Sequence, residues 1–218
     1  MRYRTVLFDL DGTLIDSIRL ILDSYHHTMA THGLPARSDQ DWLAGLGTPL
    51  TVQLKEWAHD PERMELLIGT YREYNIRNHD SMVTAYPGVV EMVRALRRAG
   101  HRTGIVTSKN RSGAVRGLRR IGLEEAIDVI VGADDVINPK PHAEPIRIAL
   151  DRLGEAAGQT IYIGDSVHDM ESGRAAGVAT GAVLWGPFDR GHLEHTQPTH
   201  WLDHPDDVLR LLNLPSGS

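Results

Sequence analysis

The stretch that decides the fold is VLFDLDGTLIDS, residues 6–17. Three apolar residues lead into Asp9, and Asp11 follows two positions later, before a Gly-Thr pair. A short apolar run bounded by turn residues predicts a buried strand. Because residues two apart share one face of a strand, Asp9 and Asp11 are expected to project together from its carboxyl end, where open α/β sheets bind ligands. The plainer alternative is a strand followed by an acidic turn.

The composition is that of a soluble globular protein, with 41% hydrophobic and 24% charged residues in a chain of 218. This length allows one large domain, or a main domain with an insert. The formal net charge of −6 does not favour a nucleic-acid-binding surface. The absence of cysteine excludes disulfides and thiolate metal sites.

The chain shows no apolar run of the roughly 18 residues that a membrane helix needs. Its first twelve residues, MRYRTVLFDLDG, become acidic too soon for a secretory signal peptide. We therefore expect a cytoplasmic protein, monomeric or homodimeric, without a membrane or nucleic-acid partner.

Helical periodicity alone fills residues 15–82. Apolar residues recur at steps of three and four from Ile15 to Met29, and Asp60-Pro61 is typical of a helix start. From residue 83 on, helices and strands alternate, which predicts a parallel sheet with right-handed crossovers. The predicted fold is α/β, with a core of residues 1–14 and 83–218 and a small all-helical cap of residues 15–82. The expected strands lie within residues 6–8, 101–109, 128–135, 160–166 and 178–185.

Three later strand ends carry polar side chains. Thr107 and Ser108 supply two hydroxyls, although such residues also cap helices. Lys140 stands between two prolines as a point cation for phosphate, although a solvated loop lysine is the ordinary alternative. Asp165 and Asp169 lie in GDSVHD, where the alternative is a capping acid and a first-turn acid of a helix.

These side chains are expected to form one site, because the carboxyl ends of parallel strands meet at one edge of the sheet. Oxygen ligands alone suit a hard cation such as Mg²⁺. Hydroxyls and a lysine supply donors to phosphate oxygens, and phosphoryl transfer needs this combination of positioning and charge neutralisation. The collected set is Asp9, Asp11, Asp165, Asp169, Thr107, Ser108 and Lys140.

The sequence resembles the haloacid dehalogenase superfamily, specifically its phosphatase branch. Four motifs of that superfamily occur in order: FDLDGTL, IVTSK, KP and GDSVHD. The second acid, Asp11, is typical of the phosphatases and is missing from the metal-independent dehalogenases. The resemblance implies a Rossmann-like core with a cap, and a small phosphorylated substrate.

The resemblance also implies roles for single residues. Asp9 would attack phosphorus and form an aspartyl phosphate. Asp11 would protonate the leaving oxygen and then activate water. Thr107 and the amide of Ser108 would bind the phosphoryl group, and Lys140 would neutralise charge between nucleophile and phosphate.

The implied cofactor is Mg²⁺. Its ligands would be the side chains of Asp9 and Asp165 and the backbone carbonyl of Asp11, with Asp169 assisting directly or through a water. One departure is visible: many relatives have KPxPxP where this chain has KPHAEP, with Ala143 in place of the middle proline.

The cap resembles that of phosphoglycolate phosphatases and of bacterial pyrophosphatases. The loop of residues 45–50, GLGTPL, is a candidate for facing the substrate, since its glycines permit close backbone approach. Four polar cap residues could reach an anionic leaving group or merely form a solvated surface: Arg72, Arg77, Asn78 and His79.

The favoured activity is a Mg²⁺-dependent phosphohydrolase acting on a small phosphomonoester, such as phosphoglycolate, or on pyrophosphate. Two alternatives stay open: a phosphomutase of the β-phosphoglucomutase type, and a catalytically silent binding module on the same fold. A zinc site is not favoured for four late histidines that lack a metal-motif spacing: His192, His195, His200 and His204.

Overall fold

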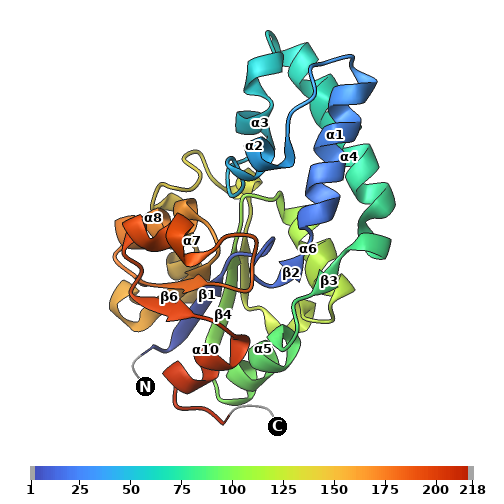
Figure 1. The fold of residues 1–218 in the computed structure, drawn as a ribbon. Coiled ribbons are helices and arrows are strands. Elements are labelled where there is room, and N and C mark those ends of the chain that lie inside the picture. The colour runs from blue at the N-terminus through green and yellow to red at the C-terminus, as the bar shows by residue number, and fades with distance from the viewer. Residues whose placement is uncertain (1–2, 216–218) are drawn as a thin grey trace.

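Six parallel strands form the central sheet in the order β5-β4-β1-β6-β7-β8 (Figure 1). The structure is a computed structural model and describes residues 3–215. The parallel α/β prediction is confirmed, and of these six strands only β8 was not predicted, because three residues are too short to show a pattern. The strands are β1 (Thr5–Phe8), β4 (Arg102–Val106), β5 (Val129–Val131), β6 (Thr160–Gly164), β7 (Ala179–Val183) and β8 (His200–Leu202).

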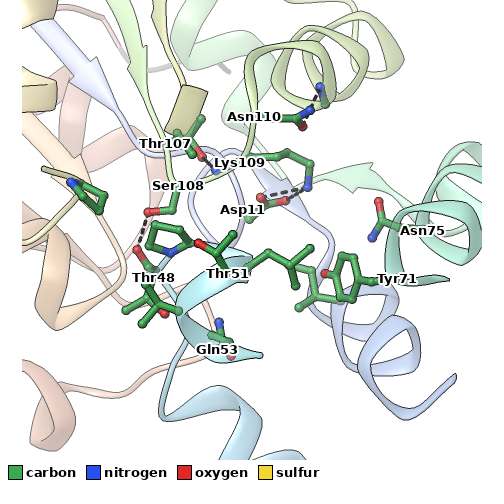
Figure 2. Close-up of a pocket in the computed structure, with 18 of the residues that line it drawn as sticks. Asp11, Thr48, Thr51, Gln53, Tyr71, Asn75, Thr107, Ser108, Lys109 and Asn110 are labelled. Atoms are coloured by element: carbon green, nitrogen blue, oxygen red, sulfur yellow. Dashed lines mark hydrogen bonds and ion pairs between the residues drawn. The ribbon is translucent and has the colours of Figure 1, made fainter. Parts of the chain in front are cut away.

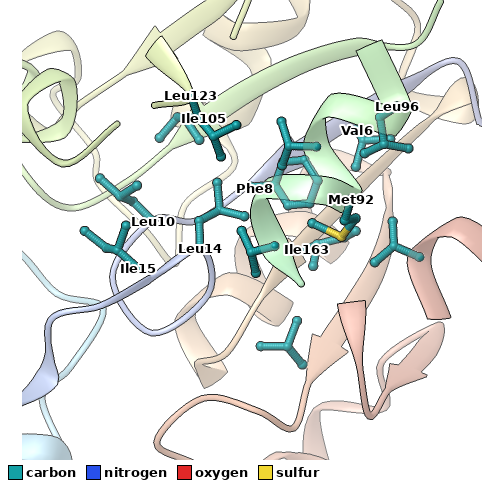
Figure 3. Close-up of a cluster of buried hydrophobic side chains, with 14 of the residues drawn as sticks. Val6, Phe8, Leu10, Leu14, Ile15, Met92, Leu96, Ile105, Leu123 and Ile163 are labelled. Carbon is teal, nitrogen blue, oxygen red and sulfur yellow. The ribbon is translucent and has the colours of Figure 1, made fainter. Parts of the chain in front are cut away.

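Strand β1 distributes its side chains to two apolar layers. Val6 and Phe8 pack on one face of the sheet with residues of the helices at 89–98, 111–120 and 205–211, as Figure 3 shows for part of this cluster. Leu7 packs on the other face with residues of the helix at 144–153. All three side chains are fully buried, and burial of each stabilises the fold by about 1.5–3 kcal/mol. The flanking helices are α5 (Val89–Arg98), α6 (Arg111–Arg120), α7 (Glu144–Leu153), α8 (Val167–Ala176) and α10 (Pro205–Leu211).

A helical insert, residues 18–82, leaves the core after β1 and has its own apolar cluster. Within this cluster the rings of Tyr25 and Trp42 stack with centroids 4.2 Å apart. Asp60 caps the last helix by accepting from the Arg63 N–H at 2.7 Å, as the Asp-Pro pair predicted. The helices of the insert are α1 (Ile18–Thr31), α2 (Asp39–Leu43), α3 (Leu50–Gln53) and α4 (Pro61–Met82).

A two-stranded antiparallel ribbon joins the insert to the core. It pairs β2 (Ile15–Asp16) with β3 (Thr84–Ala85). The assignment of Ile15 to the first helix of the insert was wrong: its side chain is fully buried in the core cluster, and α1 begins at Ile18. A strand of two residues shows no alternation, so the helical spacing that continues through α1 also absorbed Ile15.

The remaining elements are short, and none of the described helices is both long and apolar enough to cross a membrane. They are η1 (Lys55–Trp57), η2 (Glu124–Ala126), η3 (Ala133–Asp135), η4 (Ala157–Gln159), α9 (Arg190–Leu193) and η5 (Glu194–Thr196).

Candidate active site

A cavity of about 810 Å³ is lined by residues from the carboxyl edge of the sheet and from the helical insert. Five of the residues that the sequence singled out line it, and Figure 2 shows several of them together with residues of the insert. Lys140 and Asp169 do not line the cavity. They reach it through Asp9, which lies 3.1 Å from the Lys140 ammonium group. The five lining residues are Asp9, Asp11, Thr107, Ser108 and Asp165.

Three buried carboxylates meet below the cavity. Asp9 follows β1, and Asp165 and Asp169 follow the neighbouring strand β6, so the parallel pairing of these strands brings the three side chains together. One oxygen from each lies within 4.8 Å of the others, and no other group of three or more histidine or acidic side chains in residues 3–215 does so.

Burial dominates the electrostatics of Asp9 and Asp165, whereas Lys140 and the hydrogen bonds to Asp169 outweigh burial and lower the pKa of that acid. Burial raises the pKa of Asp9 to about 7, against the opposing effect of Lys140. Burial, with the charges of Asp169 and Asp9, also raises the pKa of Asp165 well above its usual range. Within the described chain, the ion pairs of this trio are made by Lys140 alone, so full ionisation of the three acids needs further positive charge. An oxygen-lined pocket with this requirement fits a hard divalent cation.

Asp169 is fully engaged by protein donors. Its Oδ1 accepts from the Lys140 ammonium at 2.6 Å and from the Tyr162 hydroxyl at 2.8 Å. Its Oδ2 accepts from the Ser166 N–H at 3.0 Å and from the Ser166 hydroxyl at 2.6 Å. A carboxylate offers about four acceptor positions, so these contacts occupy all of them. Asp169 therefore holds Lys140 in place beside Asp9.

Asp165 is positioned by the turn that follows β1. The Thr13 hydroxyl donates to Asp165 Oδ1 at 2.7 Å. Gly12 has a φ of +86°, and a Cβ at this position would lie 2.5 Å from Asp165 Oδ2. The glycine of the DGT turn is therefore required both by its backbone conformation and by the close carboxylate.

The Asp11 carboxylate lies apart from the acidic trio. It accepts from the Ser17 hydroxyl at 2.5 Å, and the Lys109 ammonium contacts its two oxygens at 2.9 and 3.0 Å. Tyr71 and Asn75 of α4 lie on the insert side of this pair (Figure 2). Sequence reasoning gave Lys109 no role, although its place directly after two hydroxyl residues at a strand end was a usable signal.

The predicted phosphate-binding residues connect the core with the insert. The Ser108 hydroxyl donates to the Gly47 carbonyl at 2.5 Å, and the Thr107 hydroxyl accepts from the Lys109 N–H at 3.2 Å. Gly47 belongs to the loop that was expected to face the substrate, and residues 46–50 of this loop line the cavity. Its φ is +91°, and a Cβ there would lie 2.7 Å from the Ser166 hydroxyl oxygen.

The four polar residues of α4 separate into two pairs. Arg72 and His79 line the cavity. Arg77 instead forms an exposed ion pair with Glu73 at 2.8 Å, and the Asn78 amide donates to a backbone carbonyl of its own helix at 2.9 Å. Of these four residues, only Arg72 and His79 therefore remain candidates for contact with an anionic leaving group.

Comparisons with known proteins agree with this geometry. Residues 6–183 match the family model described as haloacid dehalogenase-like hydrolase. A pyrophosphatase PpaX of Halalkalibacterium halodurans is 40% identical over 214 residues, covering 98% of this chain and 99% of that protein. A haloacid dehalogenase-like family hydrolase of Streptococcus pneumoniae superposes with a TM-score of 0.83 at 26% identity, covering 97% of this chain and 99% of that one. A predicted phosphoglycolate phosphatase of Haemophilus somnus shares the fold, with a TM-score of 0.88 at 22% identity and coverage of 97% and 99%.

Proposed function

The chain belongs to the haloacid dehalogenase-like hydrolase family, and we propose that it is a Mg²⁺-dependent phosphohydrolase that works through an aspartyl phosphate. One observation carries the proposal: two carboxylates that are two residues apart in the sequence lie in different surroundings. Asp9 lies in the buried acidic trio against Lys140, whereas Asp11 faces the insert and pairs with Lys109. Two acids held in different surroundings are suited to different tasks in one reaction.

The acidic trio supports the assignment of the metal. Asp9 and Asp165 would hold Mg²⁺ with their side chains, together with the backbone carbonyl of Asp11. Bound there, the ion would supply positive charge to the phosphoryl oxygens. Asp169 acts through Lys140 instead of as a direct ligand, because protein donors occupy its acceptor positions.

The proposed reaction gives each of these side chains one role. An Asp9 oxygen attacks phosphorus, the bond to the leaving oxygen breaks, and Asp11 gives that oxygen a proton. Asp11 then takes a proton from the water that hydrolyses the aspartyl phosphate and regenerates Asp9. Lys140 stabilises the ionised nucleophile, while Thr107 and the amide of Ser108 hold the phosphoryl group. The helical insert serves as the cap that shields these steps from solvent.

Pyrophosphate is the substrate that the comparisons favour, because the 40% identical relative is named a pyrophosphatase. A small phosphomonoester such as phosphoglycolate is the second candidate. We expect purified protein with Mg²⁺ to release phosphate from a panel of pyrophosphate, phosphoglycolate and sugar phosphates, with the highest kcat/KM for pyrophosphate. Release from no member of the panel would favour the silent binding module, and isomerisation of β-glucose 1-phosphate without phosphate release would favour the mutase.

The nucleophile is tested separately by Asp9→Asn. This change keeps the shape of the side chain but removes the attacking charge, so turnover should fall on the order of 10⁴-fold or more. The variant should keep a cooperative thermal transition, which separates loss of chemistry from loss of fold. Retention of substantial activity by a correctly folded variant would remove Asp9 from the role of nucleophile.

A further inference from the structure

His79 is a buried polar side chain whose contacts inside the protein are incomplete. It lies in the last turn of α4, is 1% exposed and lines the cavity. Its Nε2 atom is buried and has no hydrogen-bond partner among the described residues. A buried polar atom without a partner is costly, so its presence beside a cavity indicates a ligand that completes it.

The orientation of this ring is fixed from its other side. The Nδ1 atom lies 2.8 Å from Asp80 Oδ1. Hydrogen bonds from Arg116 and His79 lower the pKa of Asp80 to about 2, so this carboxylate is ionised and can only accept. Nδ1 therefore carries the proton, and Nε2 of the neutral ring presents a lone pair.

A side chain of the core holds Asp80 in turn. Arg116 of α6 donates to the two oxygens of Asp80, from Nε at 3.1 Å and from the terminal guanidinium nitrogen at 3.2 Å. This fork extends from the core to the last turn of α4. The contacts from Arg116 through Asp80 to His79 thus set the direction of the ring.

Cationic groups share the cavity with His79. Lys109, Arg72 and Arg116 line it, and Lys109 stands against Asp11, the proposed acid for the leaving group. Burial lowers the pKa of His79, and the charges of Lys109 and Arg116 lower it further, against the opposing contact with Asp80. The ring is therefore neutral at pH 7 in the free protein, and an arriving anion would favour its protonated form.

We propose that His79 is a specificity-determining residue that binds a second, anionic group on the leaving portion of the substrate, beside Lys109. This inference rests on the proposed function and narrows its substrate class to molecules such as pyrophosphate. A leaving phosphate fits the site because it carries both protonated and ionised oxygens near neutral pH. The neutral ring accepts from the first kind, and the protonated ring donates to the second. A substrate whose leaving group has no further acidic group makes neither contact.

The test compares His79→Asn on two substrates. Asparagine keeps a polar atom near Asp80 but has nothing at the position of Nε2. We expect kcat/KM for pyrophosphate to fall about 10- to 100-fold, the loss of one charge-assisted hydrogen bond. The value for p-nitrophenyl phosphate, whose leaving group has no second acid, should stay within about threefold. His79→Gln, which returns a polar atom at the longer reach, should recover part of the loss.

The matched control is His59→Asn, which changes an exposed histidine of the same insert that does not line the cavity. It should leave both substrates unaffected. Equal losses on both substrates with His79→Asn would show that His79 only supports the fold, and no loss on either would also overturn the proposal. If the wild-type protein hydrolyses neither substrate, the proposed phosphohydrolase function is wrong, and this failure is distinguishable from a failure that is specific to His79.

A binding measurement on the wild-type protein does not depend on turnover or on a foldable variant. With Mg²⁺ present, methylenediphosphonate should shift the imidazole NMR signal of His79, because this analogue carries both phosphoryl ends. Methylphosphonate, with one end, should leave that signal in place. An unmoved signal with the first analogue, or equal shifts with both, would contradict the assignment.

Discussion

Asp169→Asn tests whether the buried ion pair with Lys140 holds the active site together. Lys140 and Asp169 are 1% and 0% exposed, and their charged atoms lie 2.6 Å apart. The amide NH₂ of asparagine would face donors in either orientation: Lys140 and Tyr162 on one side, Ser166 on the other. The substitution therefore leaves Lys140 with Asp9 as its one remaining ion-pair partner among the described residues, and it opposes an NH₂ group to one pair of donors.

The expected loss follows from two opposing effects. Removing one partner of a buried pair costs about 3–5 kcal/mol. Relief of repulsion with Asp9 and Asp165, each of which has an oxygen within 4.8 Å of one on Asp169, offsets part of this, but the direct contact with the ammonium at 2.6 Å is lost. The loss of attraction prevails, and we expect a net cost of about 3 kcal/mol. For a chain of this size, that corresponds to a decrease in Tm of about 6–12 °C.

The assay is thermal unfolding followed by circular dichroism in EDTA, so that metal binding does not contribute. Glu73→Gln is the control, since it breaks the exposed pair with Arg77, worth at most about 1 kcal/mol. Turnover of p-nitrophenyl phosphate by Asp169→Asn with Mg²⁺ should also fall by at least about tenfold, because Lys140 loses the contact that directs it to Asp9. A Tm equal to or above that of the wild type would refute this reasoning, since it would mean that repulsion within the trio outweighs the pair.

Three further outcomes are expected. EDTA should abolish phosphate release and added Mg²⁺ should restore it with the circular dichroism unchanged; full activity in EDTA would contradict the metal assignment. Gly12→Ala should cost about 1–3 kcal/mol from its positive φ and, by displacing Asp165, raise the Mg²⁺ concentration for half-maximal activity about tenfold, in thermal melts and metal titrations. Ser108→Ala should raise KM roughly fivefold by removing its hydrogen bond to the Gly47 carbonyl; an unchanged KM would show that this contact does not hold the insert closed.

The sequence was most informative for residues whose position relative to a strand determines where they lie in the fold. In a parallel sheet, a residue directly after a strand lies at the carboxyl edge, so Asp9 and Asp165 could be placed together once β1 and β6 were recognised as strands. The three-residue β8 and the two-residue β2 were missed, because a pattern needs more residues than these strands have. Their pairing is decided by tertiary contacts and not by propensity.

The directions of the side chains at the edge could not be predicted from the same patterns. Lys140 was expected to neutralise charge between Asp9 and the phosphate, but nothing in the sequence showed that its ammonium is buried against both Asp9 and Asp169. The contact between Asp11 and Lys109 joins residues 98 positions apart. Such pairings depend on how two loops approach each other, and residue types alone do not encode that approach.

The cap side of the cavity shows what helical geometry adds to residue type. Positions 68, 71, 72, 75, 76 and 79 of α4 line the cavity, at the steps of three and four that define one helix face. Arg72 and His79, seven residues apart, belong to this face, whereas Arg77 is rotated away from it. Helical spacing alone therefore excludes Arg77 once the limits of α4 are known, but it does not exclude Asn78, which lies seven residues from Tyr71 and whose amide donates to a carbonyl of its own helix. Helical spacing does not show that this face meets the core instead of solvent. That follows from the fork between Arg116 and Asp80, 36 positions apart, which positions the end of α4 and turns His79 into the cavity.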